Sequence, residues 1–307
     1  MGKSLACAAA LVACLIGSPS AFAQSDDSGQ ALTEEQQQAL AAMREFWESL
    51  DRRTGSIALG DELVTLEVPE DFYFLGSEDA ERVLVDVWGN PPSSEPPLGM
   101  LFPAEYTPFD SDSWAVTIEY SDEGHVSDSD AAGIEYDELL VQMQEDTRDA
   151  NADRIDAGYD PVELIGWAEP PHYDNASRKL YWARELRFGE SPDTTLNYEI
   201  RILGRTGVLS MTFIAASDQL AEIDDSRDGV LAMAEFNPGS RYEDFDSSID
   251  KVAAYGIGAL IAGKVAAKAG LLAGGLLLLK KVGIFIVVAF AALARKAKAL
   301  FSRGSPS

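Results

Sequence analysis

Hydrophobic and polar residues alternate along several stretches in the middle of the chain, and this period of two is typical of half-buried β-strands. Three of these stretches follow one another with short connections, which predicts an antiparallel meander. An earlier pair predicts a hairpin that turns at Gly60-Asp61. The predicted strands are residues 56–59, 63–68, 114–120, 180–188, 196–202 and 208–215.

Other stretches place hydrophobic residues three and four positions apart, which predicts amphipathic helices. Thr33 and Gln36 form a capping-box pattern at the start of the first helix. The sequence Asn90-Pro91-Pro92 ends the second, because proline cannot continue a helix. The predicted helices are residues 33–50, 77–88, 136–155 and 217–236. Strands cluster and do not alternate with helices, so we predict an α+β domain with an antiparallel sheet and flanking helices.

The first 23 residues have the pattern of a secretory signal peptide. Lys3 gives a positive start, residues 5–16 are apolar, and Ala21-Phe22-Ala23 is a small-x-small cleavage site. Cleavage there leaves Gln24 as the first residue of the mature chain. An export signal places the body of the protein outside the cytoplasm.

Lipoprotein processing is an alternative for the same leader. Leu11-Val12-Ala13-Cys14 resembles a lipobox, which would attach a lipid to Cys14. Cys7 and Cys14 are the only two cysteines, so either route leaves the mature chain without an internal disulfide.

The C-terminal part of the chain is an apolar tail. Residues 252–294 contain no Asp, Glu, Asn or Gln, and four lysines divide them into three apolar blocks. A membrane helix needs about 20 apolar residues, so we predict one crossing from about residue 255 to 279. In that crossing Lys264 and Lys268 snorkel or face a partner. Two crossings that form a hairpin are the alternative.

Charge is distributed very unevenly along the chain. The sequence has 51 acidic and 24 basic residues, a formal net charge of −27, yet no acid follows Asp250 and nine basic residues do. An acidic body repels nucleic acids, so we expect no nucleic-acid partner. The basic end favours an anionic membrane surface and the cytoplasmic side. Lys179 is the only lysine of the body, which indicates either adaptation to salt or a compositional bias.

These patterns predict an inner-membrane protein with a single crossing and its main domain in the periplasm. The expected partners are the lipid bilayer and an envelope protein, and the oligomeric state stays open. The predicted parts are a signal peptide at 1–23, a flexible linker at 24–32, an acidic α+β periplasmic domain at 33–250, a membrane anchor of one or two transmembrane helices at 251–294 and a basic tail at 295–307.

Several long blocks of the chain resemble a bacterial family, the domain of unknown function 2167. The blocks are VLVDVWGNPP at 83–92, WAVTIEYSDEGHVSDSDA at 114–131, PPHYDNASRKLYWARELRF at 170–188 and LNYEIRILGRTGVL at 196–209. The resemblance implies export and membrane anchoring, since the family is described as membrane-anchored. It implies no activity.

Few residues suit common catalytic or cofactor chemistry. His125 and His172 are the only histidines, and we interpret both as surface loop residues. The sequence contains no G-x-S-x-G, H-E-x-x-H, C-x-x-C or P-loop pattern, so we predict no cofactor and nominate no catalytic residue.

One segment matches the pattern of an EF-hand calcium loop. Asp224, Ser226, Asp228 and Glu235 would supply oxygen ligands to the ion. The favoured interpretation is a helix with solvated acids, and therefore no metal. Asp128-Ser129-Asp130 is a poorer partial match.

The predicted meander is rich in basic residues: Arg178, Lys179, Arg184, Arg187, Arg201 and Arg205. They form either an anion-binding face or cross-strand ion pairs with Glu185 and Glu199, and we favour the pairs.

Two functions remain from these observations. The favoured one is a non-enzymatic binding or scaffolding domain, because the usual catalytic groups are missing. The alternative is a carboxylate-dependent hydrolase that acts on an envelope polymer. Neighbouring carboxylates such as Glu119 and Glu123 are too common here to nominate a site, since glycoside hydrolysis needs a defined separation across a cleft.

Overall fold

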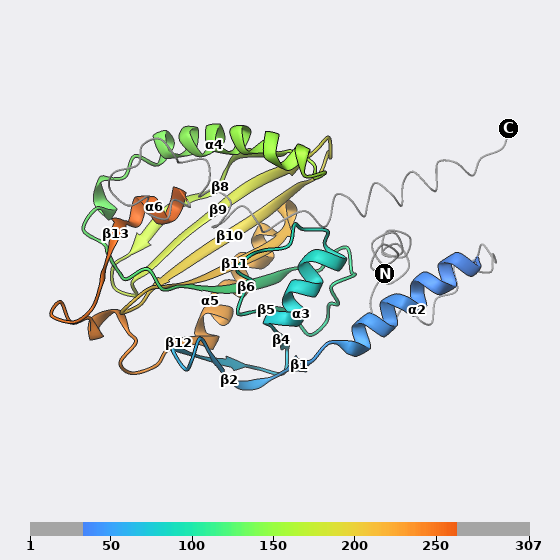
Figure 1. The fold of residues 1–307 in the computed structure, drawn as a ribbon, viewed down its shortest axis with the longest axis horizontal. Coiled ribbons are helices and arrows are strands. Elements are labelled where there is room, and N and C mark those ends of the chain that lie inside the picture. The colour runs from blue at the N-terminus through green and yellow to red at the C-terminus, as the bar shows by residue number, and fades with distance from the viewer. Residues whose placement is uncertain (1–32, 263–307) are drawn as a thin grey trace.

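The centre of the protein is an eight-stranded sheet, in a computed structural model that describes residues 33–262 (Figure 1). The strand order is β1-β4-β5-β6-β11-β10-β9-β8, and every neighbouring pair is antiparallel. The strands are β1 (Arg52–Arg53), β4 (Phe72–Gly76), β5 (Gly99–Pro103), β6 (Ala115–Ser121), β8 (Val162–Asp174), β9 (Lys179–Phe188), β10 (Thr194–Leu203) and β11 (Val208–Ala216).

The predicted α+β class and the meander β9-β10-β11 are confirmed. No helix within residues 33–262 is long and apolar enough to cross a membrane. The predicted signal peptide, most of the predicted anchor and the basic tail lie outside the described residues.

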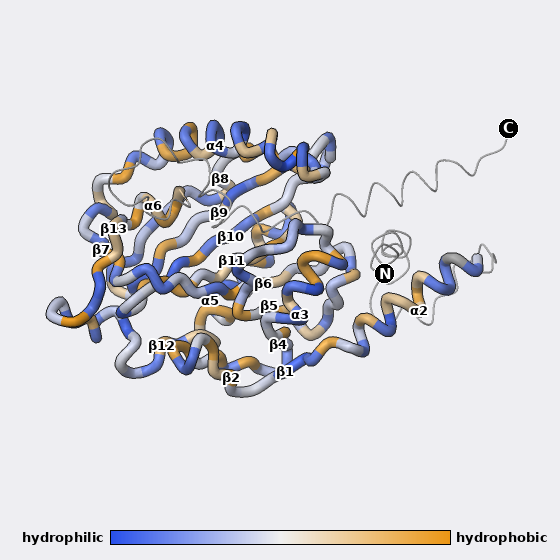
Figure 2. The backbone as a smooth tube through the Cα atoms, in the orientation of Figure 1, coloured by the Kyte–Doolittle hydropathy of each residue, from blue (hydrophilic) through white to orange (hydrophobic). Residues whose placement is uncertain are grey.

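Helices cover one face of the sheet at both ends, and we call this the helical face. The helices α2 (Glu34–Ser49) and α3 (Ser77–Arg82), with the π-helical segment Val83–Val87, pack beside β4 and β5. The other end is covered by α4 (Tyr136–Asp156), along which hydrophilic and hydrophobic positions alternate in Figure 2, and α6 (Ile257–Ala262). The predicted capping box of α2 is present at Thr33 and Gln36.

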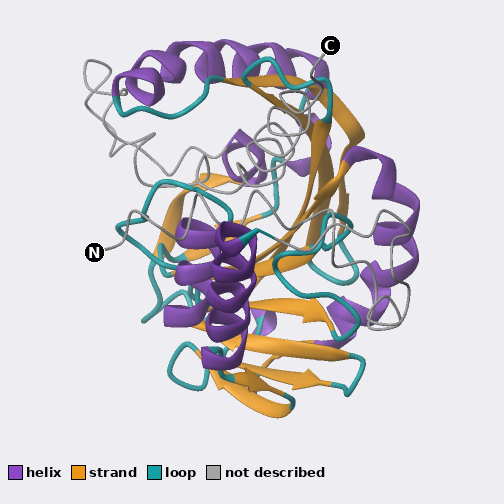
Figure 3. Cartoon of the chain, turned by 90° about the vertical axis from the view of Figure 1, so that its right-hand side faces the viewer, coloured by secondary structure: helices purple, strands orange, loops and turns teal. Residues whose placement is uncertain are grey.

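The opposite face packs against α5 (Leu220–Met233) and a second sheet of three strands. Helices therefore lie on both sides of the large, curved sheet (Figure 3). The second sheet has the order β12-β3-β2, with β2 (Gly55–Leu59), β3 (Val64–Val68) and β12 (Ala234–Phe236). The helix predicted for 217–236 is thus too long: it ends at Met233, because the next three residues pair with β3.

The long strand β8 was not predicted from the sequence. It contains Pro170 and Pro171 and pairs with β9 through three register shifts. Proline is tolerated there because β8 is the edge strand, where one side needs no N–H donors. Asn151 of α4 holds its start: the Asn151 amide group donates to the Val162 carbonyl and accepts from the Val162 N–H, both at 2.8 Å.

The body extends beyond the expected boundary at residue 250. The strand β13 (Val252–Gly256) pairs in parallel with β7 (His125–Ser127), and α6 follows it directly. Ile257 and Ile261 of α6 are 0% and 2% exposed in the core of the helical face. A membrane crossing that began near residue 255 would have to withdraw both side chains from this core.

Asp130 fixes the start of α6. Its carboxylate accepts hydrogen bonds from the N–H groups of Ile257 at 3.0 Å and Gly258 at 3.3 Å. A side chain on Gly256 would collide with that carboxylate, so glycine is required at this close approach.

We predict that a chain cut after Ala262 folds as stably as the intact body, whereas a chain cut after Asp250 loses about 3 kcal/mol or more. Full burial of each isoleucine contributes about 1.5–3 kcal/mol, and the shorter chain lacks both Ile257 and Ile261. Urea unfolding of the two chains measures the difference. Ile249→Ala, at a side chain that is 73% exposed, is the matched control, and equal midpoints for the two truncated chains would contradict the prediction.

Candidate functional site

Polar side chains occupy the middle of the helical face, between the helices at its two ends. We call this area the polar floor. The register places Thr117 beside Thr212 and Glu199 in one row, and Glu119 beside Ser210 and Arg201 in the next. The floor consists of Thr117 and Glu119 from β6, Ser210 and Thr212 from β11, Asn197, Glu199 and Arg201 from β10, and Arg184 from β9.

Glu199 lies at the centre of the floor and is only 3% exposed. Its carboxylate accepts hydrogen bonds from Arg184 on the neighbouring strand and, at 2.9 Å, from Arg201 Nη2. The guanidinium group of Arg201 also lies 5.1 Å from the centre of the Trp182 ring. Two cations therefore share one buried carboxylate.

The expected cross-strand pairing with Glu199 is confirmed for Arg184, and Arg201 joins it from the same strand as Glu199, whereas the pairing with Glu185 is wrong. Glu185 accepts instead from the Thr194 hydroxyl at 2.6 Å. The other arginines of the meander have carboxylate partners elsewhere: Arg178 with Asp128, Arg187 with Glu163, and Arg205 with Asp250.

Several polar atoms of this face are buried without a hydrogen-bond partner in the described part of the chain. They are Arg184 Nε, Arg201 Nη1, Trp182 Nε1 and Thr117 Oγ1. Trp182 is 0% and Thr117 1% exposed. An unsatisfied buried donor costs about 1–3 kcal/mol, and native proteins rarely leave several together without a reason.

Burial also lowers the pKa of both arginines. Burial, together with the charge of the nearby Arg201, lowers the pKa of Arg184 to about 10. Burial likewise lowers the pKa of Arg201 to about 10, against the opposing effect of Glu119. Both stay protonated at neutral pH, so the floor holds two cations beside the carboxyl groups of Glu199 and Glu119.

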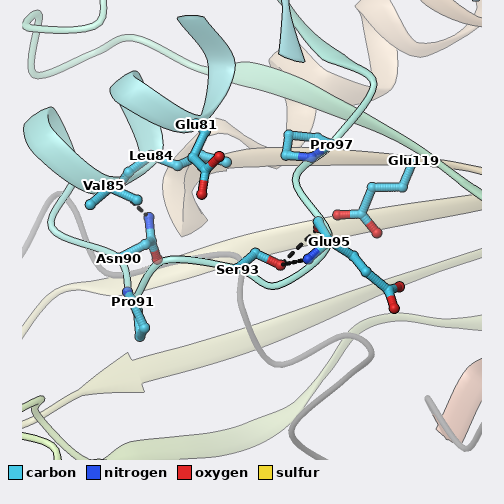
Figure 4. Close-up of a pocket in the computed structure, with 9 residues that line it drawn as sticks. All are labelled: Glu81, Leu84, Val85, Asn90, Pro91, Ser93, Glu95, Pro97 and Glu119. Atoms are coloured by element: carbon cyan, nitrogen blue, oxygen red, sulfur yellow. Dashed lines mark hydrogen bonds between the residues drawn. The ribbon is translucent and has the colours of Figure 1, made fainter. Parts of the chain in front are cut away.

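A small pocket borders the floor on the side of α3. Glu81, Leu84 and Val85 line it from the helix, the loop from Asn90 to Pro97 closes it, and Glu119 reaches it from β6. The carboxylates of Glu81 and Glu119 point into this space from α3 and from β6 (Figure 4). Burial raises the pKa of Glu119, Arg201 lowers it, and Glu95 raises it.

The two histidines lie in strands and not in the expected surface loops. His125 of β7 is 9% exposed and stacks against Phe245 and Tyr242, with ring centres 4.0 and 4.3 Å away. Burial lowers the pKa of His125. His172 of β8 is exposed and lies 3.5 Å from Glu169. Neither belongs to the polar floor or the pocket.

The residues of the EF-hand pattern lie in a helix and a strand. Asp224, Ser226 and Asp228 belong to α5, and Glu235 belongs to β12. Arg227 pairs with Asp224 at 3.3 Å and with Asp228 at 3.4 Å. A calcium loop requires a non-helical turn around the ion, so the helical interpretation describes this segment.

Other acidic residues of the described chain are also engaged within the protein. Glu235 pairs with Arg241 at 2.6 Å, and the partial match at 128–130 is occupied by contacts to Arg178 and α6. Among residues 33–262, no three His, Cys, Asp or Glu side chains are grouped to hold a metal ion.

The family model of "Protein of unknown function (DUF2167)" matches residues 51–291. No curated protein matches the sequence.

Three solved structures have a related arrangement. Cyanobacterial PsbP (CyanoP) from Synechocystis sp. PCC 6803 has 11% identity, a TM-score of 0.34, and coverage of 62% of this chain and 93% of that one. LpqN, involved in cell envelope biogenesis of Mycobacterium tuberculosis, has 13% identity, a TM-score of 0.31, and coverage of 64% and 97%. The Saccharomyces cerevisiae Ran-binding protein Mog1p has 7% identity, a TM-score of 0.27, and coverage of 61% and 96%. Likeness at this level carries no argument about function.

We predict that Glu119→Gln stabilises the protein more at pH 8 than at pH 5. Because burial raises the pKa of Glu119 in the folded state, ionisation of its carboxyl group costs stability only as the pH rises through that pKa. Glutamine removes this cost. Melting temperatures of the variant and the parent at both pH values measure the effect. Glu48→Gln, on the exposed side of α2, is the control. A difference in melting temperature between Glu119→Gln and the parent that is the same at both pH values would contradict the prediction.

Proposed function

The chain belongs to the DUF2167 family of proteins of unknown function, and we propose that it is an exported, membrane-anchored envelope protein whose α+β body binds a partner at the polar floor. The body lies on the periplasmic face of the inner membrane and acts by binding or scaffolding.

Sequence patterns at the two ends support export and anchoring. Residues 1–23 have the features of a cleaved signal, and residues 263–294 contain apolar blocks without an acid. Since α6 packs into the body, the proposed single crossing begins after Ala262 and not near residue 255. It reaches about 20 residues only by including Lys280 and Lys281. The basic cluster at 295–307 then lies on the cytoplasmic side.

Alkaline phosphatase fused after Ser307 tests this topology. One crossing leaves the enzyme in the cytoplasm and inactive, because the basic cluster is retained there. Active phosphatase at this position would reject the single crossing in favour of a hairpin.

One observation carries the proposal of binding. Four polar groups of the helical face are buried in the described structure with no hydrogen-bond partner. A partner that supplies the missing acceptors recovers the energy that their burial costs. The rigid strands β9 and β10 hold the two arginines in place before binding, which limits the entropy lost on association.

Capture from detergent-solubilised membranes tests this function. The tagged full chain, Arg201→Gln and the control Arg187→Gln are compared for the molecules that they retain. Arg187 pairs with Glu163 on the exposed part of β9, so its loss leaves the floor intact. We expect a species that the parent and the control retain and the floor variant loses. Identical recovery by all three chains would reject the floor as the binding surface.

A hydrolase remains the second candidate because Glu119 combines burial with a place at a pocket. A carboxyl group whose pKa is raised by burial suits a general acid, and Glu81 or Glu95 supplies a second carboxylate in the same pocket. Release of soluble products from purified envelope polymer by the parent and by Glu48→Gln, but not by Glu119→Gln, would favour this function. The absence of products from every chain would oppose it.

A further inference from the structure

The polar floor brings two arginines together in a very acidic protein. The whole chain carries 51 acidic residues against 24 basic ones, yet Arg184 and Arg201 share the single carboxylate of Glu199. Glu119 is the other acid of the floor, and it lies in the same row as Arg201. Burial raises the pKa of its carboxyl group, whereas Arg201 lowers it.

The unpartnered N–H groups adjoin this cluster of charges. Arg184 and Arg201 each direct one nitrogen to Glu199, and each keeps another buried nitrogen without an acceptor, Nε and Nη1 respectively. Trp182 lies opposite Glu199 across the strand pair, and its indole N–H also lacks an acceptor. Three donors without acceptors thus occupy neighbouring positions around Glu199.

We propose that the polar floor binds a single oxyanion, a carboxylate or phosphate group, through the free N–H groups of Arg184, Arg201 and Trp182; this rests on the proposed binding function. Guanidinium groups match the oxygens of both anions in geometry as well as in charge. An oxyanion supplies acceptors to all three donors.

The surrounding charge limits the size of the ligand. The acidic body repels a long polyanion, and the donors belong to one buried area of two adjacent strands. The ligand is therefore a small molecule, or the single charged end of a larger neutral one.

The test measures melting temperatures of the full chain in a neutral maltoside detergent while sodium phosphate or sodium acetate replaces sodium chloride at constant ionic strength. A ligand that binds the folded state alone raises its stability with the logarithm of concentration. We expect this rise with at least one of the two oxyanions in the parent and in Arg187→Gln, and no rise in Arg201→Gln. The salt that raises the melting temperature, phosphate or acetate, identifies phosphate or carboxylate as the recognised group.

A second variant keeps the test decisive if Arg201→Gln fails to fold. Trp182→Phe removes one donor and keeps an aromatic ring under Arg201. We expect this variant to need roughly tenfold more anion for the same shift, because a hydrogen bond to a charged group contributes about 1.5–3 kcal/mol. An equal affinity of parent and Trp182→Phe would exclude Trp182 as a donor and overturn the proposed site.

The measurements distinguish three cases: a general salt effect, failure of the oxyanion proposal alone, and failure of the proposed binding function as well. Phosphate stabilises many proteins by exclusion from their surface, so an equal rise in all variants, Arg201→Gln included, would overturn the oxyanion site. If no oxyanion acts but membrane capture still depends on Arg201, the floor binds a partner of other chemistry and only the oxyanion proposal fails. If neither result depends on Arg201, both proposals fail.

Discussion

The central strands of the eight-stranded sheet bury most of their side chains on both faces, so a charged group there needs a partner close by. On the side of α5 the partners are apolar, and Tyr198, Ile200 and Phe213 pack there without exposure. On the helical face the same strands carry charges. Glu199 can lie there only because Arg184 and Arg201 accompany it, since removal of one member of a buried ion pair costs about 3–5 kcal/mol.

The same constraint explains why the polar floor is a better candidate site than the acidic surface. Exposed acids are solvated by water and need no partner, whereas the floor keeps polar atoms away from water. Its strands belong to the most regular part of the sheet, with nine paired positions between β9 and β10. Regular pairing holds the guanidinium groups in fixed directions, and a binding site benefits from such rigidity.

Local sequence patterns predicted the elements whose conformation depends little on the segments packed against them. The capping box at Thr33 and the strand predicted from the alternation of residues 196–202 depend on a few adjacent residues, and both were confirmed. The strands β4 and β5 were missed because their short apolar runs are mostly buried on both sides and show no alternation. An apolar segment such as α6 has the same sequence pattern whether a protein core or a membrane covers it, so the pattern does not distinguish the two.

The polar floor could not be predicted for a related reason. The alternation of Asn197, Glu199 and Arg201 with apolar residues is what a solvent-facing side of a strand also shows. In the folded protein Asn197 and Glu199 are only 2% and 3% exposed, and no local pattern indicates that burial. The pairing of Arg184 with Glu199 was predictable from cross-strand proximity, whereas the gathering of charged and unpartnered groups in one floor depends on the register of four strands.

The parallel pairing of β13 with β7 has a mechanical consequence. The chain leaves the described body through β13 and α6, so a pull on α6 toward the C-terminus acts next on the pairing of β13 with β7. Two further features oppose such a pull. Arg205 donates two hydrogen bonds of 2.8 and 3.0 Å to Asp250, just upstream of β13, and the burial of Ile257 and Ile261 holds α6 in the core.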